Sequence, residues 1–162
     1  MSSEIMSLEM DVFCLLLLIR ILYQMYINRV QNDHWNYFYY TIAWACVYLF
    51  MDAIWIMNVK HFLTFSKIQS GIFNSFYFCS LAMLVCSWYV YVQKTLHSAV
   101  LKHKKILVLT FIPLIFFIGS SLLSYWTHGL FVIDQVGNYH RGKLLPFYFL
   151  ILFAYILSLI HI

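Results

Sequence analysis

Five apolar stretches occupy most of the chain, and short polar segments separate them. The stretches cover residues 11–27, 37–57, 71–92, 106–126 and 145–162. Each is close to the roughly 20 apolar residues that a helix needs to cross the hydrocarbon core of a bilayer. They contain continuous apolar runs, such as residues 15–19, rather than the alternating pattern of a membrane β-barrel strand. The pattern therefore predicts an all-α, polytopic transmembrane helix bundle with about five spanning helices.

Composition indicates the same class of protein. Of the 162 residues, 64% are hydrophobic and 10% are charged, and the mean hydropathy is +0.81. Polar residues at this frequency are too few to coat a soluble globule. The expected partner is therefore the lipid bilayer, and no nucleic-acid partner is expected.

The distribution of basic residues predicts the orientation of the bundle. The loop between the third and fourth stretches contains Lys94, Lys102, Lys104 and Lys105, whereas the first ten residues are acidic and contain no Lys or Arg. Because cytoplasmic loops are enriched in Lys and Arg, we expect a multi-pass protein of the bacterial cytoplasmic membrane with its N-terminus outside. A binding site for lipid head groups or for a partner is the alternative interpretation of the lysine cluster.

The residue types that support catalysis or metal binding are not arranged for it in this sequence. The four cysteines, at positions 14, 46, 79 and 86, lie within the apolar stretches and form no CxxC pair. Neither a disulfide framework nor a zinc site is therefore expected. The sequence also contains no glycine-rich phosphate loop and no HExxH motif. We predict no catalytic residues, no metal site and no cofactor among these residues.

The strongest candidate for a binding site is a stripe along the second stretch. Tyr40, Trp44, Tyr48, Asp52 and Trp55 recur at spacings of four, four, four and three, which places them on one face of a helix. An aromatic face that ends in a carboxylate near the outer boundary suits a cationic or amphipathic ligand. The alternative interpretation is interfacial anchoring and interior packing, with Asp52 hydrogen-bonded to a neighbouring helix.

Two further features of the stretches concern packing. A patch of small residues in the fourth stretch, formed by Gly119, Ser120, Ser121 and Ser124, is suited to close approach of another helix. Arg20, a charge within the first stretch, is expected to extend toward the cytoplasmic head groups rather than to pair with Asp52.

The segment between the fourth and fifth stretches predicts a β-hairpin. Residues 131–134 favour a strand, residues 135–138 contain turn residues, and residues 139–142 form a second arm. We expect this hairpin to close over the outer ends of the helices, either as a plain connector or as a binding loop. The candidate ligand-binding residues are therefore Trp44, Tyr48, Asp52, Trp55, Asp134, Tyr139 and Arg141.

The same segment carries a family resemblance. Residues 131–142 read Phe-Val-Ile-Asp-Gln-Val-Gly-Asn-Tyr-His-Arg-Gly. This run resembles the pattern F-Y-I-D-x-x-N-x-Y-x-R-G, with a small adjustment of register at Gly137 and Asn138. The pattern occurs in the N-terminal membrane domains of bacterial diguanylate cyclases and related sensor proteins. The matching positions are Phe131, Ile133, Asp134, Asn138, Tyr139, Arg141 and Gly142. The aromatic run at residues 88–91 is similar to the same family.

The resemblance implies a sensory, signal-transducing input domain. In that family a membrane domain of seven or eight helices precedes a cytoplasmic GGDEF domain, through which a homodimer could form. The chain contains no GGDEF domain. Residues 157–162, Leu-Ser-Leu-Ile-His-Ile, also match the translation of a transposon adapter used in sequencing. We therefore expect a natural membrane domain of residues 1–156 that continues beyond them, no enzymatic activity in these residues, and a diguanylate cyclase as the full-length parent.

Three other classes of membrane protein are alternatives. A half-unit of a small transporter or channel would be indicated by inverted repeats or broken helices near the midplane. A sensor histidine kinase would place a similar membrane domain before a different output domain. An integral-membrane enzyme would require a cluster of acidic, histidine or metal-binding residues, which the sequence does not show.

Overall fold

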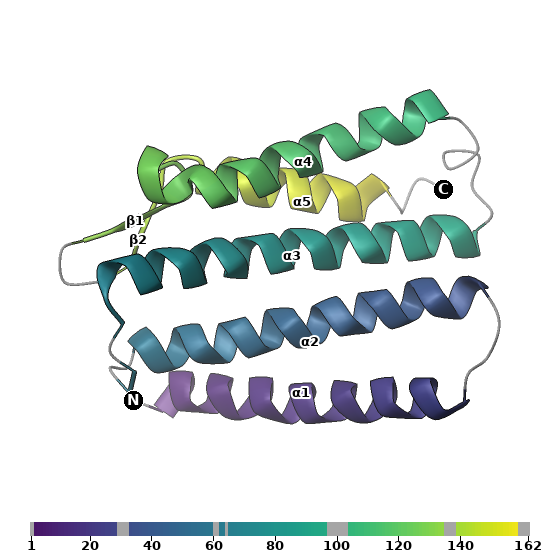
Figure 1. The fold of residues 1–162 in the computed structure, drawn as a ribbon, viewed down its shortest axis with the longest axis horizontal. Helices are drawn as coiled ribbons and strands as arrows, with labels where there is room; N and C mark the ends of the chain where they lie inside the picture. The colour runs from purple at the N-terminus through teal and green to yellow at the C-terminus, as the bar shows by residue number, and fades with distance from the viewer. Residues whose placement is uncertain are drawn as a thin grey trace.

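The computed structural model describes residues 2–28, 33–59, 62–63, 65–96, 104–134 and 139–158. Its described residues form five helices and a two-stranded sheet (Figure 1). The elements are α1 (Ser2–Asn28), α2 (Asp33–Val59), α3 (Lys67–Thr95), α4 (Lys104–Thr127), β1 (Phe131–Ile133), β2 (Tyr139–Arg141) and α5 (Leu145–Ser158). The prediction of a helix bundle is confirmed. Each predicted apolar stretch lies within or largely within one helix.

Three of the described helices are long and apolar enough to cross a membrane. Their apolar segments are Met6–Asn28, Asn36–Asn58 and Lys67–Thr95. The apolar segments of the last two helices, Phe111–Thr127 and Leu145–Leu157, are shorter. At about 1.5 Å per residue, the 14 residues of α5 extend about 21 Å, less than the roughly 30 Å hydrocarbon core. The structure therefore supports a membrane protein with three candidate spans, rather than establishing the five that the sequence predicts.

The helices lie side by side and reverse direction from one to the next (Figure 1). Helix α1 packs against α2, α2 against α3, and α3 against both α4 and α5. As a result, the N-terminus of α1 and the β-hairpin lie at the same end of the bundle, which we call the hairpin end. The α3 C-terminus and the α4 N-terminus lie at the opposite end.

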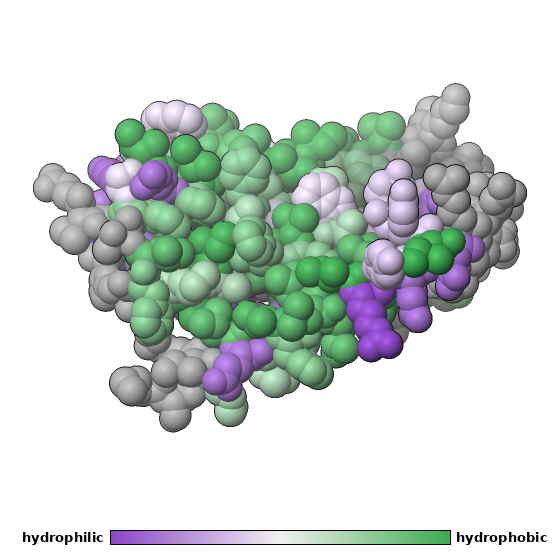
Figure 2. All heavy atoms as spheres, turned by 60° about the horizontal axis from the view of Figure 1, so that its bottom comes forward, coloured by the Kyte–Doolittle hydropathy of each residue, from purple (hydrophilic) through white to green (hydrophobic). Residues whose placement is uncertain are grey.

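The outer face of the bundle is strongly apolar. Figure 2 shows the face nearest α1 as a broad hydrophobic band with polar residues toward its ends. Large exposed side chains on α1 include Met10, Phe13, Leu16, Leu17 and Ile19. A continuous apolar surface of this kind is unusual for a soluble monomer and suits contact with lipid.

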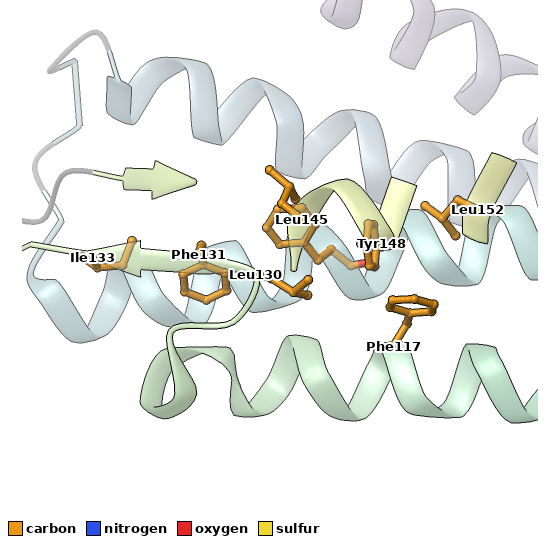
Figure 3. Packing of buried hydrophobic residues seen from close by; sticks show 8 residues of the cluster. Phe117, Leu130, Phe131, Ile133, Leu145, Tyr148 and Leu152 are labelled. Carbon is orange, nitrogen blue, oxygen red and sulfur yellow. The ribbon is translucent and has the colours of Figure 1, made fainter. Parts of the chain in front are cut away.

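Buried hydrophobic side chains gather between α3, α4, β1 and α5 (Figure 3). The cluster consists of Phe78, Phe117, Leu130, Phe131, Ile133, Leu145, Tyr148 and Leu152. The Phe131 ring stacks on Phe78 with centroids 6.0 Å apart, and the Tyr148 ring meets both Phe78 and Phe117 edge-on. The Tyr148 hydroxyl donates a hydrogen bond to the Phe78 carbonyl oxygen. Helix α5 therefore contacts α3 through both ring packing and a hydrogen bond.

One member of the predicted small-residue patch, Ser121, lies where α3 and α4 approach closely, whereas no heavy atom lies within 4 Å of the position that a Cβ at Gly119 would occupy. Ser121 is completely buried, and its carbonyl oxygen accepts a hydrogen bond of 3.0 Å from the Ser75 hydroxyl. Nearer the hairpin end, the Tyr125 ring lies directly over Gly71, where a Cβ atom would overlap it. The contact therefore depends on glycine at position 71.

The predicted hairpin is present, and its strands pair antiparallel with Ile133 opposite Tyr139 and Phe131 opposite Arg141. Its predicted turn, residues 135–138, lies outside the described residues. The return strand is fixed to the start of the hairpin by hydrogen bonds from Gly142 N to the Leu130 carbonyl (2.8 Å) and from Leu144 N to the Gly129 carbonyl (2.9 Å). These bonds close the base of the hairpin, and strand β1 packs against α3 and α4.

Candidate functional site

Four aromatic side chains from three elements meet at the hairpin end, and we call them the aromatic cluster: Tyr48, Trp55, Tyr77 and Tyr139. The hydroxyl oxygens of Tyr48 and Tyr77 are 3.3 Å apart and share a hydrogen bond. The Trp55 ring stacks on Tyr77 with centroids 6.5 Å apart and meets Tyr139 edge-on at 5.9 Å. The cluster therefore connects α2 and α3 to strand β2 of the hairpin.

Two carboxyl groups adjoin the aromatic cluster. The Asp52 carboxyl group, one turn from Tyr48 on α2, interacts with the Tyr77 hydroxyl and with the carboxyl group of Asp11 on α1. Asp11 also acts electrostatically on Tyr48. Asp11 thereby adds a residue of α1 to the site, and two acidic groups lie close to the tyrosine side chains of the aromatic cluster.

The local sequence explains why α2 contributes most of the site. Tyr48, Asp52 and Trp55 are spaced four and three residues apart, so they project from one face of the helix. That face is turned toward Tyr77 of the neighbouring antiparallel helix. The structure thus brings together three of the predicted candidates on α2.

Tyr139 is the hairpin residue that reaches the cluster, and it does so because it lies opposite the buried Ile133 on the inward face of the hairpin. Burial raises the pKa of Tyr139 above its ordinary value, and the positive charge of Arg141 partly offsets this shift. The phenol therefore stays protonated at neutral pH and keeps its hydroxyl as a hydrogen-bond donor. Arg141 itself is exposed on the same strand.

The other predicted candidates lie elsewhere. Asp134 pairs with His140 across the hairpin, with 3.5 Å between Oδ2 and Nε2. Trp44 is half-buried, one turn from Tyr48 on the side away from Asp52, and Tyr40 is exposed one turn further on. At about 6 Å per four residues, Trp44 lies about 12 Å along the axis from Asp52. The far half of the predicted stripe therefore lies at least two turns of helix from Asp52.

Sequence reasoning missed Tyr77 and Asp11. Tyr77 is one of many aromatic residues in the third stretch, and its place at the centre of the cluster depends on how α2 and α3 pack. Asp11 stands at the polar boundary of the first stretch, where an acidic residue needs no special explanation. A usable signal was the presence of two acids, Asp11 and Asp52, near the same predicted membrane boundary.

The side chains of the site are of kinds that attract cations. Among the described residues, no group of three or more His, Cys, Asp or Glu side chains is placed to hold a metal ion. Carboxylates attract cations, and the faces of Trp and Tyr rings attract them as well. The arrangement therefore suits an organic cation.

Comparisons with protein families, with curated proteins and with solved structures find no match for this chain. The resemblance to diguanylate cyclase membrane domains accordingly stays a prediction from the hairpin sequence.

Proposed function

We propose that this chain is the sensory input domain of a bacterial membrane signalling protein whose output domain is a diguanylate cyclase. The observation that carries the proposal is the aromatic cluster with its two carboxyl groups, because it joins α1, α2, α3 and β2. A ligand bound among these side chains would contact four segments at once. Its binding would favour one packing arrangement of those segments over another, which is the response required of an input domain.

The roles of the motif residues support the proposal. Ile133 is buried against the bundle, and Tyr139 belongs to the aromatic cluster. Gly142 lies where the return strand meets the Gly129 and Leu130 backbone. The resemblance therefore falls on residues that build and close the candidate site.

In the proposed arrangement all five helices cross the membrane and the hairpin end faces outside. Lys94 lies at the opposite end, where its Nζ is 5.4 Å from the centre of the Tyr37 ring. The positive-inside rule would place that end in the cytoplasm. Helix α5 leads to the same side, where a cyclase domain would act.

The reading frame at the source locus tests the proposed output domain. Sequencing the locus through and beyond codon 156 is expected to give a frame that departs from this one at Leu157, continues through further spans and encodes a GGDEF domain. A stop codon directly after Ile162, or a different downstream domain, would contradict the proposal.

A further inference from the structure

Most of the buried polar atoms that lack a partner among the described residues lie toward the hairpin end. Within the part of the chain that the structure describes, four buried side-chain atoms find no hydrogen-bond partner in the protein: Asp11 Oδ2, Ser70 Oγ, Asn74 Oδ1 and Gln93 Oε1. Ser70 is 1% exposed and Asn74 is 3% exposed. A buried polar atom that lacks a partner is costly, so these atoms require an explanation.

Three of the four atoms, those of Asp11, Ser70 and Asn74, lie toward the hairpin end of the bundle. Ser70, Asn74 and Tyr77 project within about 60° of one another around α3, so they share one stripe. Asn74 is one turn from Phe78, on which Phe131 of strand β1 stacks. The stripe therefore runs beneath the hairpin toward Tyr77, and Tyr77 interacts with Asp52, which in turn interacts with Asp11.

The partnerless atoms at this end are all able to accept a hydrogen bond. The Asn74 amide nitrogen already donates to the Ser70 carbonyl at 2.8 Å, which leaves Oδ1 free as an acceptor. Carboxylate oxygens accept only, and a serine hydroxyl can accept. The site thus combines spare acceptors, negative charge and aromatic faces, and its natural complement is a cation that donates several hydrogen bonds.

From this combination we propose that the hairpin end binds a primary ammonium group. The ammonium group donates hydrogen bonds to Asn74 Oδ1 and Ser70 Oγ, while Asp52 and Asp11 supply the counter-charge. The rings of Trp55, Tyr77 and Tyr139 flank the cation and the carbon chain that carries it. This inference deepens the proposed function by naming the ligand class. The ammonium group can belong to a soluble amine or to an ethanolamine lipid head group.

Binding of 2-phenylethylamine to the purified chain in phosphatidylcholine nanodiscs, measured by calorimetry against empty nanodiscs, tests the proposal. Saturable binding is expected for the primary amine. Binding at least about tenfold weaker is expected for its N,N,N-trimethyl derivative, which cannot donate hydrogen bonds, and for neutral 2-phenylethanol. Equal binding of all three compounds, or no saturable binding of the amine, overturns the proposal.

Asn74→Leu tests the role of the spare acceptor, and Gln93→Leu is its matched control. Gln93 is 1% exposed on the same helix, and its amide oxygen also lacks a partner, but it lies at the opposite end. We expect Asn74→Leu to weaken amine binding about tenfold or more and Gln93→Leu to leave it unchanged. The unfolding midpoint without amine verifies that both variants fold. Asp52→Asn, which keeps the shape and removes the charge, should weaken binding in a folded protein even if Asn74→Leu does not fold. Wild-type affinity in folded Asn74→Leu or Asp52→Asn overturns the proposal.

The source of the ammonium group and the sensory role are tested separately. Part of the phosphatidylcholine is replaced with phosphatidylethanolamine. If the ethanolamine head group is the ligand, it should compete with the soluble amine and weaken its binding. If a soluble amine is the ligand, its binding should be unchanged. Binding in nanodiscs requires no output domain. If the full-length protein binds the amine without any change in cyclase activity, the sensory role is contradicted and the amine site is retained. If the cyclase response to the amine persists in Asn74→Leu, the amine site is contradicted and the sensory role is retained.

Discussion

The hydroxyl group of Ser124 organises the turn from α4 into the hairpin. Its oxygen accepts hydrogen bonds from Leu130 N (2.8 Å) and Phe131 N (3.0 Å) and donates to the Phe131 carbonyl oxygen at 3.5 Å. The chain reverses between these residues through His128, which adopts a positive φ of 55°. Because Ser124 is completely buried, no water reaches the two backbone donors that it satisfies.

Replacing Ser124 with alanine should therefore destabilise the protein. We expect a loss of about 1–3 kcal/mol in the free energy of unfolding for each buried donor left without a partner. Ser120→Ala is the control, since the Ser120 hydroxyl donates to the Phe117 carbonyl within its own helix at 2.9 Å. Unfolding in mixed micelles measures both variants, and equal losses would contradict this account of Ser124.

At the residue scale the sequence predicts which side chains share a helix face but not what each one meets. The α2 spacing places Tyr48, Asp52 and Trp55 together, and the structure agrees. The partners of Ser124 lie six and seven residues later, beyond a reversal whose path no local pattern specifies. Tyr77 joins the site only because two helices pack in one particular register.

At the scale of elements, the positions of the helices follow from hydropathy but their ends do not. The first stretch is predicted to begin at residue 11, whereas α1 begins at Ser2 and includes the acidic first turns. An apolar stretch ends at the first polar residues. A helix continues through polar residues as long as its backbone hydrogen bonds continue. Helix α3 instead begins where Ser66 and Gln69 cap it: Ser66 N donates to Gln69 Oε1 at 2.9 Å, and Gln69 N donates to Ser66 Oγ at 3.4 Å.

The hairpin depends on close contact between two backbone segments at Gly142. A methyl group at this position would overlap the Gly129 carbonyl oxygen and the Leu130 carbonyl carbon, and neither atom can rotate away. We expect Gly142→Ala to lower the free energy of unfolding by about 1–3 kcal/mol, the usual cost of overpacking. The measurement is chemical unfolding of the purified protein.

Gly119→Ala is the matched control, because no heavy atom lies within 4 Å of the position its Cβ would occupy. Gly119 is inside α4, where alanine is about 0.5–1 kcal/mol more favourable than glycine. This variant should be as stable as the wild type or more so. If Gly142→Ala behaved in the same way, the backbone contact would not be what closes the hairpin.

At the scale of the whole molecule, the orientation in the membrane determines which face of the bundle meets a ligand. In a background with the four cysteines replaced by alanine, Lys143→Cys and Leu96→Cys introduce exposed labelling sites at the two ends of the bundle. A membrane-impermeant maleimide applied to intact spheroplasts should modify the cysteine at position 143 and spare the one at position 96. Both sites should react after permeabilisation. The reverse pattern would place the hairpin in the cytoplasm and contradict the proposed arrangement.

The order in which a ribosome releases the chain gives the packing of Tyr148 a further consequence. The contact between its hydroxyl group and the Phe78 carbonyl joins α3 to α5, which is synthesised later. During translation, α1, α2 and α3 can therefore associate, and Tyr48 can meet Tyr77, before the hairpin exists. Strand β2 and α5 then arrive together to cover a surface that is already formed. The segments that close the site are therefore synthesised after the segments that form its base.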